Sequence, residues 1–184
     1  MYFVTGTSRG IGLEFIKQLV TRENSIVYAG VRNVSSLPKA FPTLPANLHI
    51  IQCDVISDLS VACAVEMVEK TSGRVVLINN AAIDNRLSIK DTSIASFQVV
   101  IETHFVGVHR VTRAFLPLIQ KSSIKKVVNI SSDFGSIELN DRSIAGAYNT
   151  SKAALNMLTV QYKNEYADDG IIFIPMHPGD VSHY

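Results

Sequence analysis

A tyrosine and a lysine are spaced so that they can act together on a proton. Tyr148 and Lys152 stand at the two ends of the run Tyr-Asn-Thr-Ser-Lys, and a helix would place both side chains on one face, one turn apart. The ordinary pKa of a phenol is about 10, so a free tyrosine is a poor acid or base at neutral pH. A neighbouring ammonium group stabilises the phenolate and lowers that pKa. The pair is therefore a candidate for general acid–base chemistry, although the same spacing is common on amphipathic helices.

A serine-containing segment comes shortly before this pair. Residues 129–135 read Asn-Ile-Ser-Ser-Asp-Phe-Gly, at the end of an apolar run. A serine hydroxyl can donate a hydrogen bond to a substrate oxygen on which negative charge develops. With this segment ahead of it, the Tyr/Lys pair predicts a catalytic site rather than an ordinary helix face.

Three glycines follow the first apolar run of the chain. Gly6, Gly10 and Gly12 lie in Thr-Gly-Thr-Ser-Arg-Gly-Ile-Gly, directly before a helical period. The first can make a tight turn, the second lets a phosphate approach the backbone, and the third lets the helix pack on the strand. The helix N-terminus adds free N–H groups and partial positive charge. A glycine-rich turn without a ligand is the alternative, but the position between strand and helix favours dinucleotide binding.

Two arginines suggest which dinucleotide binds. Arg9 lies inside the glycine loop, and Arg32 follows the second apolar run in Gly-Val-Arg-Asn. A carboxylate after that run would repel a 2′-phosphate, whereas a guanidinium group can bind it through two hydrogen bonds. Single arginines are usually solvated surface charges. Two at these positions, with no acidic residue beside Arg32, favour NADP(H) over NAD(H).

The elements that must position these residues alternate between strands and helices. Strands are predicted at residues 2–5, 26–30, 48–52, 75–79, 126–131 and 171–175, and helices at 11–22, 58–70, 94–120 and 148–166. Several strands are continuous Val/Ile runs, as in sheets that are buried on both faces. Alternation implies right-handed crossovers and a parallel sheet. The predicted fold is α/β, a doubly wound six-stranded Rossmann sheet in one domain over residues 1–184, with ligands at the carboxyl ends of the strands.

These motifs resemble the short-chain dehydrogenase/reductase family over nearly the whole chain. The glycine spacing is Gly-x-x-x-Gly-x-Gly, and residues 3–12 and 27–33 are most similar to sniffer-type carbonyl reductases and fungal polyketide ketoreductases. The resemblance implies reduction of a ketone or aldehyde by NADPH, or the reverse oxidation of an alcohol. Ser132, three residues before Gly135, would be the catalytic serine, Tyr148 the proton donor, and Lys152 the residue that tunes Tyr148 and binds ribose.

The resemblance also implies a set of cofactor contacts. Asp54 would bind the adenine amino group, although it is equally well explained as a strand-end cap. The full set is Gly6, Ser8, Arg9, Gly10, Ile11, Gly12, Arg32, Asp54, Val55, Asn80, Ala81, Tyr148, Lys152, Pro178, Gly179 and Val181.

The sequence departs from the family pattern in three places. His104 stands in Thr-His-Phe-Val-Gly where the family has a catalytic asparagine; it could hold a water in the asparagine's place, or be a packed core histidine. Ala82 replaces a glycine, which is tolerated only if its φ is negative. The chain ends at Tyr184, so the seventh strand and the substrate lid of the family are expected to be missing.

Composition limits the other possibilities. The net charge of +1 gives no basic patch for nucleic acid, and no apolar run approaches the roughly 18 residues of a membrane span. Cys53 and Cys63 make no disulfide framework, the histidines have no metal spacing, and no leader is recognised, so a cytoplasmic protein is expected. Apolar residues on two sides of helix 94–120 predict a homodimer through the two long helices. The alternative function is an NADP(H)-binding protein without redox turnover: an isomerase, a cyclase or a regulatory partner.

Overall fold

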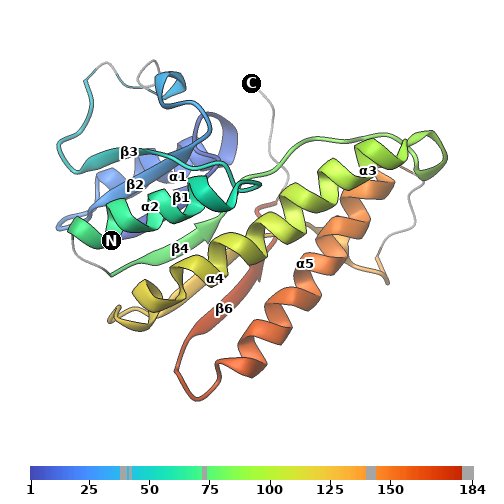
Figure 1. The fold of residues 1–184 in the computed structure, drawn as a ribbon. Helices are drawn as coiled ribbons and strands as arrows, with labels where there is room; N and C mark the ends of the chain where they lie inside the picture. The colour runs from blue at the N-terminus through green and yellow to red at the C-terminus, as the bar shows by residue number, and fades with distance from the viewer. Residues whose placement is uncertain (38–40, 42, 72–73, 140–143, 180–184) are drawn as a thin grey trace.

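A six-stranded parallel sheet forms the centre of the molecule (Figure 1). The computed structural model describes residues 1–37, 41, 43–71, 74–139 and 144–179. The strand order is β3-β2-β1-β4-β5-β6, and every neighbouring pair is parallel. The bounds of the strands are β1 Tyr2–Thr5, β2 Val27–Val31, β3 Leu48–Gln52, β4 Val76–Asn79, β5 Lys126–Ile130 and β6 Ile172–Met176. The doubly wound fold predicted from the sequence is thereby confirmed, and each strand agrees with its predicted range to within one residue at either end.

Helices pack on both faces of the sheet. They are α1 Gly10–Val20, α2 Asp58–Thr71, α3 Ile94–Ile101, α4 Gly107–Gln120 and α5 Gly146–Glu165. Alternate residues of one strand enter two separate cores. Phe3 packs with residues of α2, α4 and α5, whereas the next residue, Val4, packs with Ile16 and Leu19 of α1. The strands are therefore apolar on both sides, as their continuous Val/Ile runs predicted.

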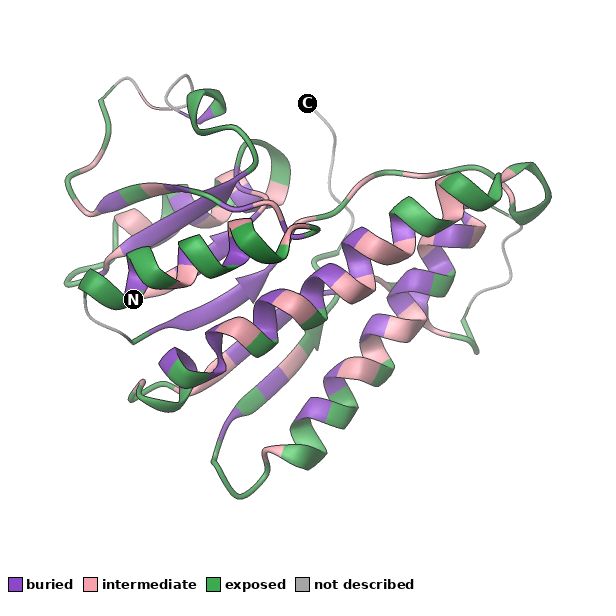
Figure 2. Cartoon of the chain, viewed as in Figure 1, coloured by how far each residue is buried: buried purple, intermediate pink, exposed green. Residues whose placement is uncertain are grey.

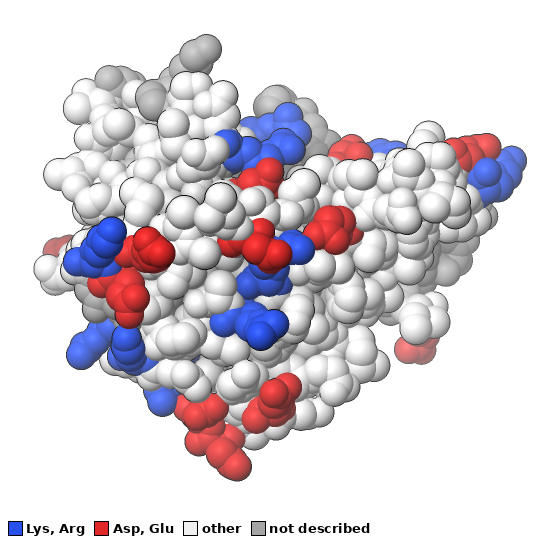
Figure 3. Space-filling model, viewed as in Figure 1, with Lys and Arg blue, Asp and Glu red and all other residues white. Residues whose placement is uncertain are grey.

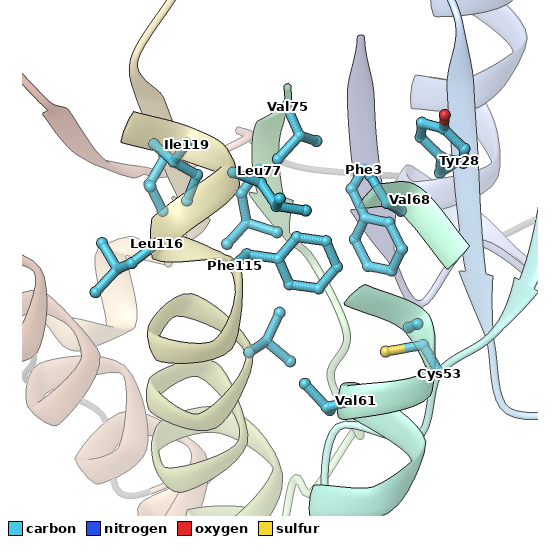
Figure 4. Packing of buried hydrophobic residues seen from close by; sticks show 14 of the residues in the cluster. Phe3, Tyr28, Cys53, Val61, Val68, Val75, Leu77, Phe115, Leu116 and Ile119 are labelled. Atoms are coloured by element: carbon cyan, nitrogen blue, oxygen red, sulfur yellow. The ribbon is translucent and has the colours of Figure 1, made fainter. Parts of the chain in front are cut away.

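Figure 4 shows the larger of these cores between the sheet and the helices. The rings of Phe3 and Phe115 lie with their centroids 4.4 Å apart and tilted by 37°, a geometry that aromatic pairs favour. Their contact joins the middle of β1 to α4. Burial is uneven across the molecule, because the outward faces of α2 and α5 are exposed (Figure 2). The carboxyl end of β6 is also more exposed than the central strands.

The long helix predicted over 94–120 is interrupted by a π turn. Residues Glu102–Val106 form this turn between α3 and α4, and the N–H of Gly107 donates to the carbonyl oxygen of Glu102. A single continuous α-helix is therefore a wrong prediction at this point. Gly107 lies against the loop after β3, where an added Cβ would come within 3.0 Å of the Val55 side chain. The extra residue in the turn rotates the helix so that its two halves present different faces, a change that π turns often make at functional sites.

The N-terminus of α2 is capped by a serine. Ser57, rather than Asp58, accepts a hydrogen bond from the N–H of Ser60 at 3.2 Å. Asp58 instead pairs with Arg110 of α4. None of the helices in the described part of the chain is both long and apolar enough to cross a membrane.

Candidate active site

The glycine loop lies at the carboxyl ends of β1 and β4, where the strand order reverses. Gly6 has a φ of +68°, and a Cβ at this position would come within 2.6 Å of the Ala81 backbone. A Cβ on Gly12 would come within 2.3 Å of the Gly6 carbonyl oxygen. Both positions therefore require glycine, one for its backbone conformation and both for close approach. These are the tight turn and the helix–strand contact expected from the sequence.

Asn80 joins this loop to the end of β4. Its side-chain amide donates to the carbonyl oxygens of Thr5 and Gly6, each at 3.0 Å. The Thr5 hydroxyl accepts the backbone N–H groups of Asn80 and Ala81, also at 3.0 Å. Ala82 is not among the non-glycine residues with positive φ in the described chain, so its methyl group is compatible with the backbone. The predicted contact residues Asn80 and Ala81 thus lie beside the glycine loop.

The space in front of α1 fits a dinucleotide phosphate. Gly10 has a φ of +57°, and an added Cβ there would meet no atom within 4 Å. Among the described residues, no side chain caps the N-terminus of α1 at Arg9. The first N–H groups of the helix, at Gly10, Ile11 and Gly12, therefore have no partner within the helix and point toward this open space. Ser8 and Arg9 are exposed beside it. An anion at this position would accept the N–H groups and meet the positive end of the helix dipole.

Arg9 and Arg32 lie at the same edge of the sheet. Thr5 pairs with Gly30 in the β1–β2 register, and each arginine follows its strand by a few residues. Both side chains belong to exposed residues. Within the described ranges neither arginine forms an ion pair, so both guanidinium groups are available to a ligand phosphate.

Asp54 and Val55 form the loop after β3. The Asp54 N–H donates to Ser60 Oγ at 2.9 Å, and its carboxylate accepts the N–H of Ile56 at 3.3 Å. The Val55 carbonyl oxygen accepts a hydrogen bond from Arg110 at 2.8 Å. Arg110 also binds Asp58 and Glu102, so one side chain ties this loop to α2 and to the π turn. The two explanations of Asp54, adenine contact and local cap, are both compatible with this geometry.

The two serines at the end of β5 have different environments. Ser131 is buried, and its hydroxyl donates to Asn156 of α5 at 2.6 Å. Ser132 lies one residue further along, where its hydroxyl accepts the Phe134 N–H at 3.2 Å and donates to Asp133 at 3.0 Å. Ser131 thus holds the strand to the helix, as expected of the strand-end serine. Ser132 is the serine that faces the tyrosine.

Tyr148 and Lys152 lie on the face of α5 that covers the end of β5. Lys152 is buried, and its Nζ donates to the Ile130 carbonyl oxygen at 2.6 Å. The same Nζ lies 5.4 Å from the centre of the Tyr148 ring. Further along the helix, Leu155, Thr159 and Tyr162 are also buried. The chain therefore brings Ser132, Tyr148 and Lys152 together at the carboxyl edge of the sheet.

The pKa values of this pair are set chiefly by burial. Burial raises the pKa of Tyr148 above its usual value, and a hydrogen bond with Ser132 acts in the opposite direction. The carboxylates of Asp84 and Asp133 raise that pKa further. Burial also lowers the pKa of Lys152 to about 8. The sequence argument expected the lysine, together with the positive nicotinamide, to lower the tyrosine pKa. In the protein without nicotinamide, desolvation of the phenol is the largest effect and raises that pKa.

His104 lies in the π turn, with 1% of its surface exposed. Its Nε2 accepts the N–H of Ile83 at 2.9 Å, and its Nδ1 is 2.8 Å from Ser151 Oγ. The ring meets Tyr148 edge-on, with centroids 5.5 Å apart. His104 therefore reaches the active site, and both of its ring nitrogens already have partners in the protein. The water-holding role suggested for it would need one of these nitrogens.

The remaining predicted contacts lie after β6. Pro178 and Gly179 are exposed, and Gly179 has a φ of +82°. Just before them, His177 Nδ1 accepts the N–H of Asp133 at 3.3 Å, which brings this turn next to Ser132. Val181 lies outside the described residues, as do Asp180 and His183.

Sequence reasoning missed three residues of the site. Ser151 bonds both His104 and the Tyr148 carbonyl oxygen, Ile83 donates to His104, and Asn156 holds Ser131. Ser151 stands three residues after Tyr148 and so shares its helix face, a signal that was present in the sequence. The roles of Ile83 and Asn156 depend on contacts between residues 21 and 25 positions apart, which no local pattern reveals.

Comparisons with known proteins agree with this geometry. Residues 1–183 match the sequence profile of the family described as short chain dehydrogenase. An uncharacterized oxidoreductase of Schizosaccharomyces pombe is 34% identical, over 98% of this chain and 73% of its own. The crystal structure of the carbonyl reductase Sniffer of Caenorhabditis elegans, which is itself described as putative, has a TM-score of 0.90 at 28% identity and covers 98% of this chain and 84% of its own.

A further similar structure has a bound cofactor. The NADPH-bound carbonyl reductase from chicken fatty liver has a TM-score of 0.83 at 30% identity, over 97% of this chain and 79% of its own. The family profile spans nearly the whole chain, and the sheet order, the glycine loop and the Tyr/Lys helix lie where the sequence resemblance required them. The chain therefore belongs to the short-chain dehydrogenase family of oxidoreductases.

Proposed function

We propose that this protein is an NADPH-dependent carbonyl reductase that converts a ketone or aldehyde to an alcohol, or catalyses the reverse reaction. One observation carries the proposal: Ser132, Tyr148 and Lys152 converge at the carboxyl edge of the sheet, the same edge at which the uncapped N-terminus of α1 lies. The three side chains can transfer a proton to a substrate oxygen, and the helix N-terminus can hold a dinucleotide phosphate. The carbonyl reductases among the similar structures support the same assignment.

The residues divide the reaction between them. A nicotinamide bound here would supply the hydride. Ser132 donates a hydrogen bond to the carbonyl oxygen, where negative charge develops as the carbon accepts that hydride. Tyr148 gives its hydroxyl proton to the same oxygen, and the phenolate that remains is reprotonated from solvent. Lys152 has two further N–H donors besides the one held by Ile130, and these can bind the ribose hydroxyls and stabilise the phenolate.

Tyr148→Phe tests the reductase proposal. The ring stays in place and only the proton donor is lost, so carbonyl reduction should fall by about 10²–10⁴-fold while NADPH binding is nearly unchanged. The measurement is NADPH absorbance with a panel of ketones and aldehydes, alongside calorimetric titration of NADPH. Turnover close to that of the parent protein would show that Tyr148 is structural and that the reductase proposal is wrong.

The cofactor proposal is NADP(H), supported by the two free guanidinium groups at Arg9 and Arg32. A hydrogen bond to a charged group contributes about 1.5–3 kcal/mol, so Arg32→Ala should weaken NADPH binding by about one to two orders of magnitude. NADH binding should change little. Arg22→Ala is the matched control, because Arg22 is an exposed arginine whose side chain bonds Tyr2 at the start of β1, the opposite edge of the sheet. Equal affinity of the parent for NADPH and NADH would reject the assignment.

A second candidate function is NADP(H) binding without redox turnover. His104 favours it, because it stands where the family has a catalytic asparagine and both of its ring nitrogens are bonded to protein groups. The two candidates differ in one measurement. A redox enzyme consumes NADPH in proportion to alcohol formed, whereas the alternative binds NADPH with the same affinity and leaves its absorbance constant over the whole substrate panel.

We also propose that the protein forms a homodimer through its long helices. α3 and α5 lie side by side at one flank of the molecule (Figure 1). Val99 of α3 is 54% exposed and Met157 of α5 is 60% exposed. An apolar hollow of about 640 Å³ lies between α3 and the loop after β3, lined by Ile56, Phe97, Val99 and Ile101 among others. A second copy related by a two-fold axis would cover these residues in a self-complementary interface.

A further inference from the structure

A chain of three hydrogen bonds runs from the loop after β4 to the backbone of Tyr148. The Ile83 N–H donates to His104 Nε2 at 2.9 Å. His104 Nδ1 and Ser151 Oγ are 2.8 Å apart. Ser151 Oγ donates to the Tyr148 carbonyl oxygen at 2.6 Å. These three hydrogen bonds link the loop after β4 to α5 through one imidazole ring. His104 is 1% exposed and Ser151 is fully buried.

The directions of these bonds fix the protonation state of the ring. A carbonyl oxygen only accepts, so the single hydroxyl proton of Ser151 is directed at Tyr148. Ser151 must then accept from His104, which places a proton on Nδ1. At the other side of the ring the Ile83 N–H only donates, so Nε2 carries a lone pair. One state satisfies all three bonds, the neutral tautomer with hydrogen on Nδ1.

We propose that His104 is a positioning residue, locked as this neutral tautomer, which holds the first turn of α5 and hence the Tyr148 side chain in its place at the end of β5. An asparagine is too short to span both partners in this way, whereas the imidazole presents an acceptor and a donor on opposite sides of a rigid ring. Through Ser151 it fixes the backbone of Tyr148, and its edge packs against the Tyr148 ring. The inference rests on the proposed reductase function only for its kinetic readout.

The charges around the ring agree with a neutral state. Lys152 of α5 is the cation that faces His104, and its charge together with burial opposes protonation of the ring. Tyr148, from the same helix, is the other titratable group in contact with it. An imidazolium would also direct an Nε2 proton at the Ile83 N–H, where two donors would meet. Protonation therefore removes the hydrogen-bond chain rather than moving a proton along it.

The first test is nitrogen NMR of the histidine-labelled full chain, with His104→Gln to assign the signals. We expect His104 to show the neutral Nδ1–H tautomer and to keep it from about pH 8 to about pH 5, although an ordinary histidine titrates near 6.5. The Tyr148 carbonyl carbon should shift in Ser151→Ala and in His104→Gln. It should not shift in Thr150→Ala, which removes the neighbouring hydroxyl, whose one hydrogen bond among the described residues goes to the Gly146 carbonyl oxygen of the same helix.

The second test is kinetic and uses the same variants with NADPH. Loss of one bond of the chain should lower kcat by about tenfold, with little change in KM for NADPH. The losses of kcat caused by His104→Gln and by Ser151→Ala should not add in the double variant, because both changes remove the same hydrogen bond. Thr150→Ala should match the parent in both constants.

The outcomes separate this inference from the proposed function. A titrating His104, an Nε2–H tautomer, or additive effects of the two variants would overturn the positioning role, whatever the enzyme reduces. A parent chain that consumes no NADPH would instead reject the reductase proposal, and the tautomer and carbonyl shifts would still decide the role of His104.

Discussion

At the scale of single residues, the site holds two basic groups in surroundings that disfavour their charge. Burial lowers the pKa of His104 to about 3 and that of Lys152 to about 8. The consequences differ, because the lysine remains largely an ammonium at neutral pH and the histidine is neutral. One group can therefore stabilise a phenolate, while the other can only make directed hydrogen bonds.

The lowered pKa of His104 predicts a loss of stability in acid. The unfolded chain binds a proton at this residue below about pH 6.5, whereas the folded chain does so only near pH 3. Protonation thus favours unfolding in this interval. The stabilising contribution is complete above about pH 6.5, falls by up to about 1.4 kcal/mol per pH unit below it, and is gone near pH 3.

Urea denaturation of the parent and of His104→Gln at pH 7, 5.5 and 4.5 checks this expectation. The free energy of unfolding should fall more steeply with acid in the parent than in the variant. His49→Gln is the control, because it removes an exposed histidine of β3. If the free energy of unfolding depends on pH equally in the parent and in His104→Gln, then His104 has the same pKa in the folded and unfolded chains.

At the scale of elements, the start of α5 contains a strained residue. Ala145 has a φ of +56° and a ψ of +40°, a left-handed conformation that a side chain disfavours by about 1–2 kcal/mol. Its N–H and that of Gly146 donate to the carbonyl oxygens of Arg86 and Leu87, at 3.3 and 3.0 Å. A Cβ on Gly146 would come within 2.9 Å of Ile89. The close contact with residues 86–89 thus holds the turn that leads into Tyr148.

Ala145→Gly should therefore stabilise the fold. Relief of the backbone strain is partly offset by the greater freedom of glycine in the unfolded chain, which leaves a gain of about 0.5–1 kcal/mol in the free energy of unfolding. Chemical denaturation measures the difference. Ala147→Gly, inside the helix two residues further on, should instead destabilise by about 1 kcal/mol or more. Equal destabilisation by both changes would mean that Ala145 is not strained.

Most elements could be predicted from the sequence, because hydrophobic period and glycine spacing are local signals. The exception is instructive: the π turn at Glu102–Val106 adds one residue to a helix whose apolar pattern remains helical on both sides. The turn is followed by Gly107, which lies in close contact with Val55 of the loop after β3, a contact between distant residues that no local pattern reveals. Tyr148 and Lys152 could be named in advance from their spacing, and Ser132 from the resemblance of its segment to the family motif. The partners of His104 could not, because Ile83 and Ser151 lie 21 and 47 positions away.

At the scale of the whole molecule, charge and apolar surface are distributed differently. Lysine and arginine are interspersed with aspartate and glutamate over the face in Figure 3, with no large region of one sign. The exposed apolar residues of α3 and α5 include Ile94, Val99, Met157 and Val160. Exposed apolar side chains on two adjacent helices support the proposed association surface.

Val99→Lys tests the proposed dimer. A charge in the middle of a self-complementary interface meets its own copy across the two-fold axis, so it should convert the protein to a monomer at micromolar concentration. Multi-angle light scattering gives the mass in solution. Met67→Lys is the control, since Met67 is an exposed apolar residue of α2, outside α3 and α5. A monomeric parent, or a dimer that tolerates Val99→Lys, would contradict the interface.

The outward side of β6 has one backbone position that cannot donate a hydrogen bond. The Ile172 N–H bonds Lys125 and the Met176 carbonyl bonds Ser131, so the even-numbered residues of β6 pair with β5 and the odd-numbered ones direct their backbone outward. Pro175 is one of the outward residues, and it has no N–H to offer. Within the described chain, β6 has a neighbouring strand on one side only. The proline thus withholds a donor on the outward side of β6, so any strand that pairs on that side lacks one hydrogen bond of the ladder.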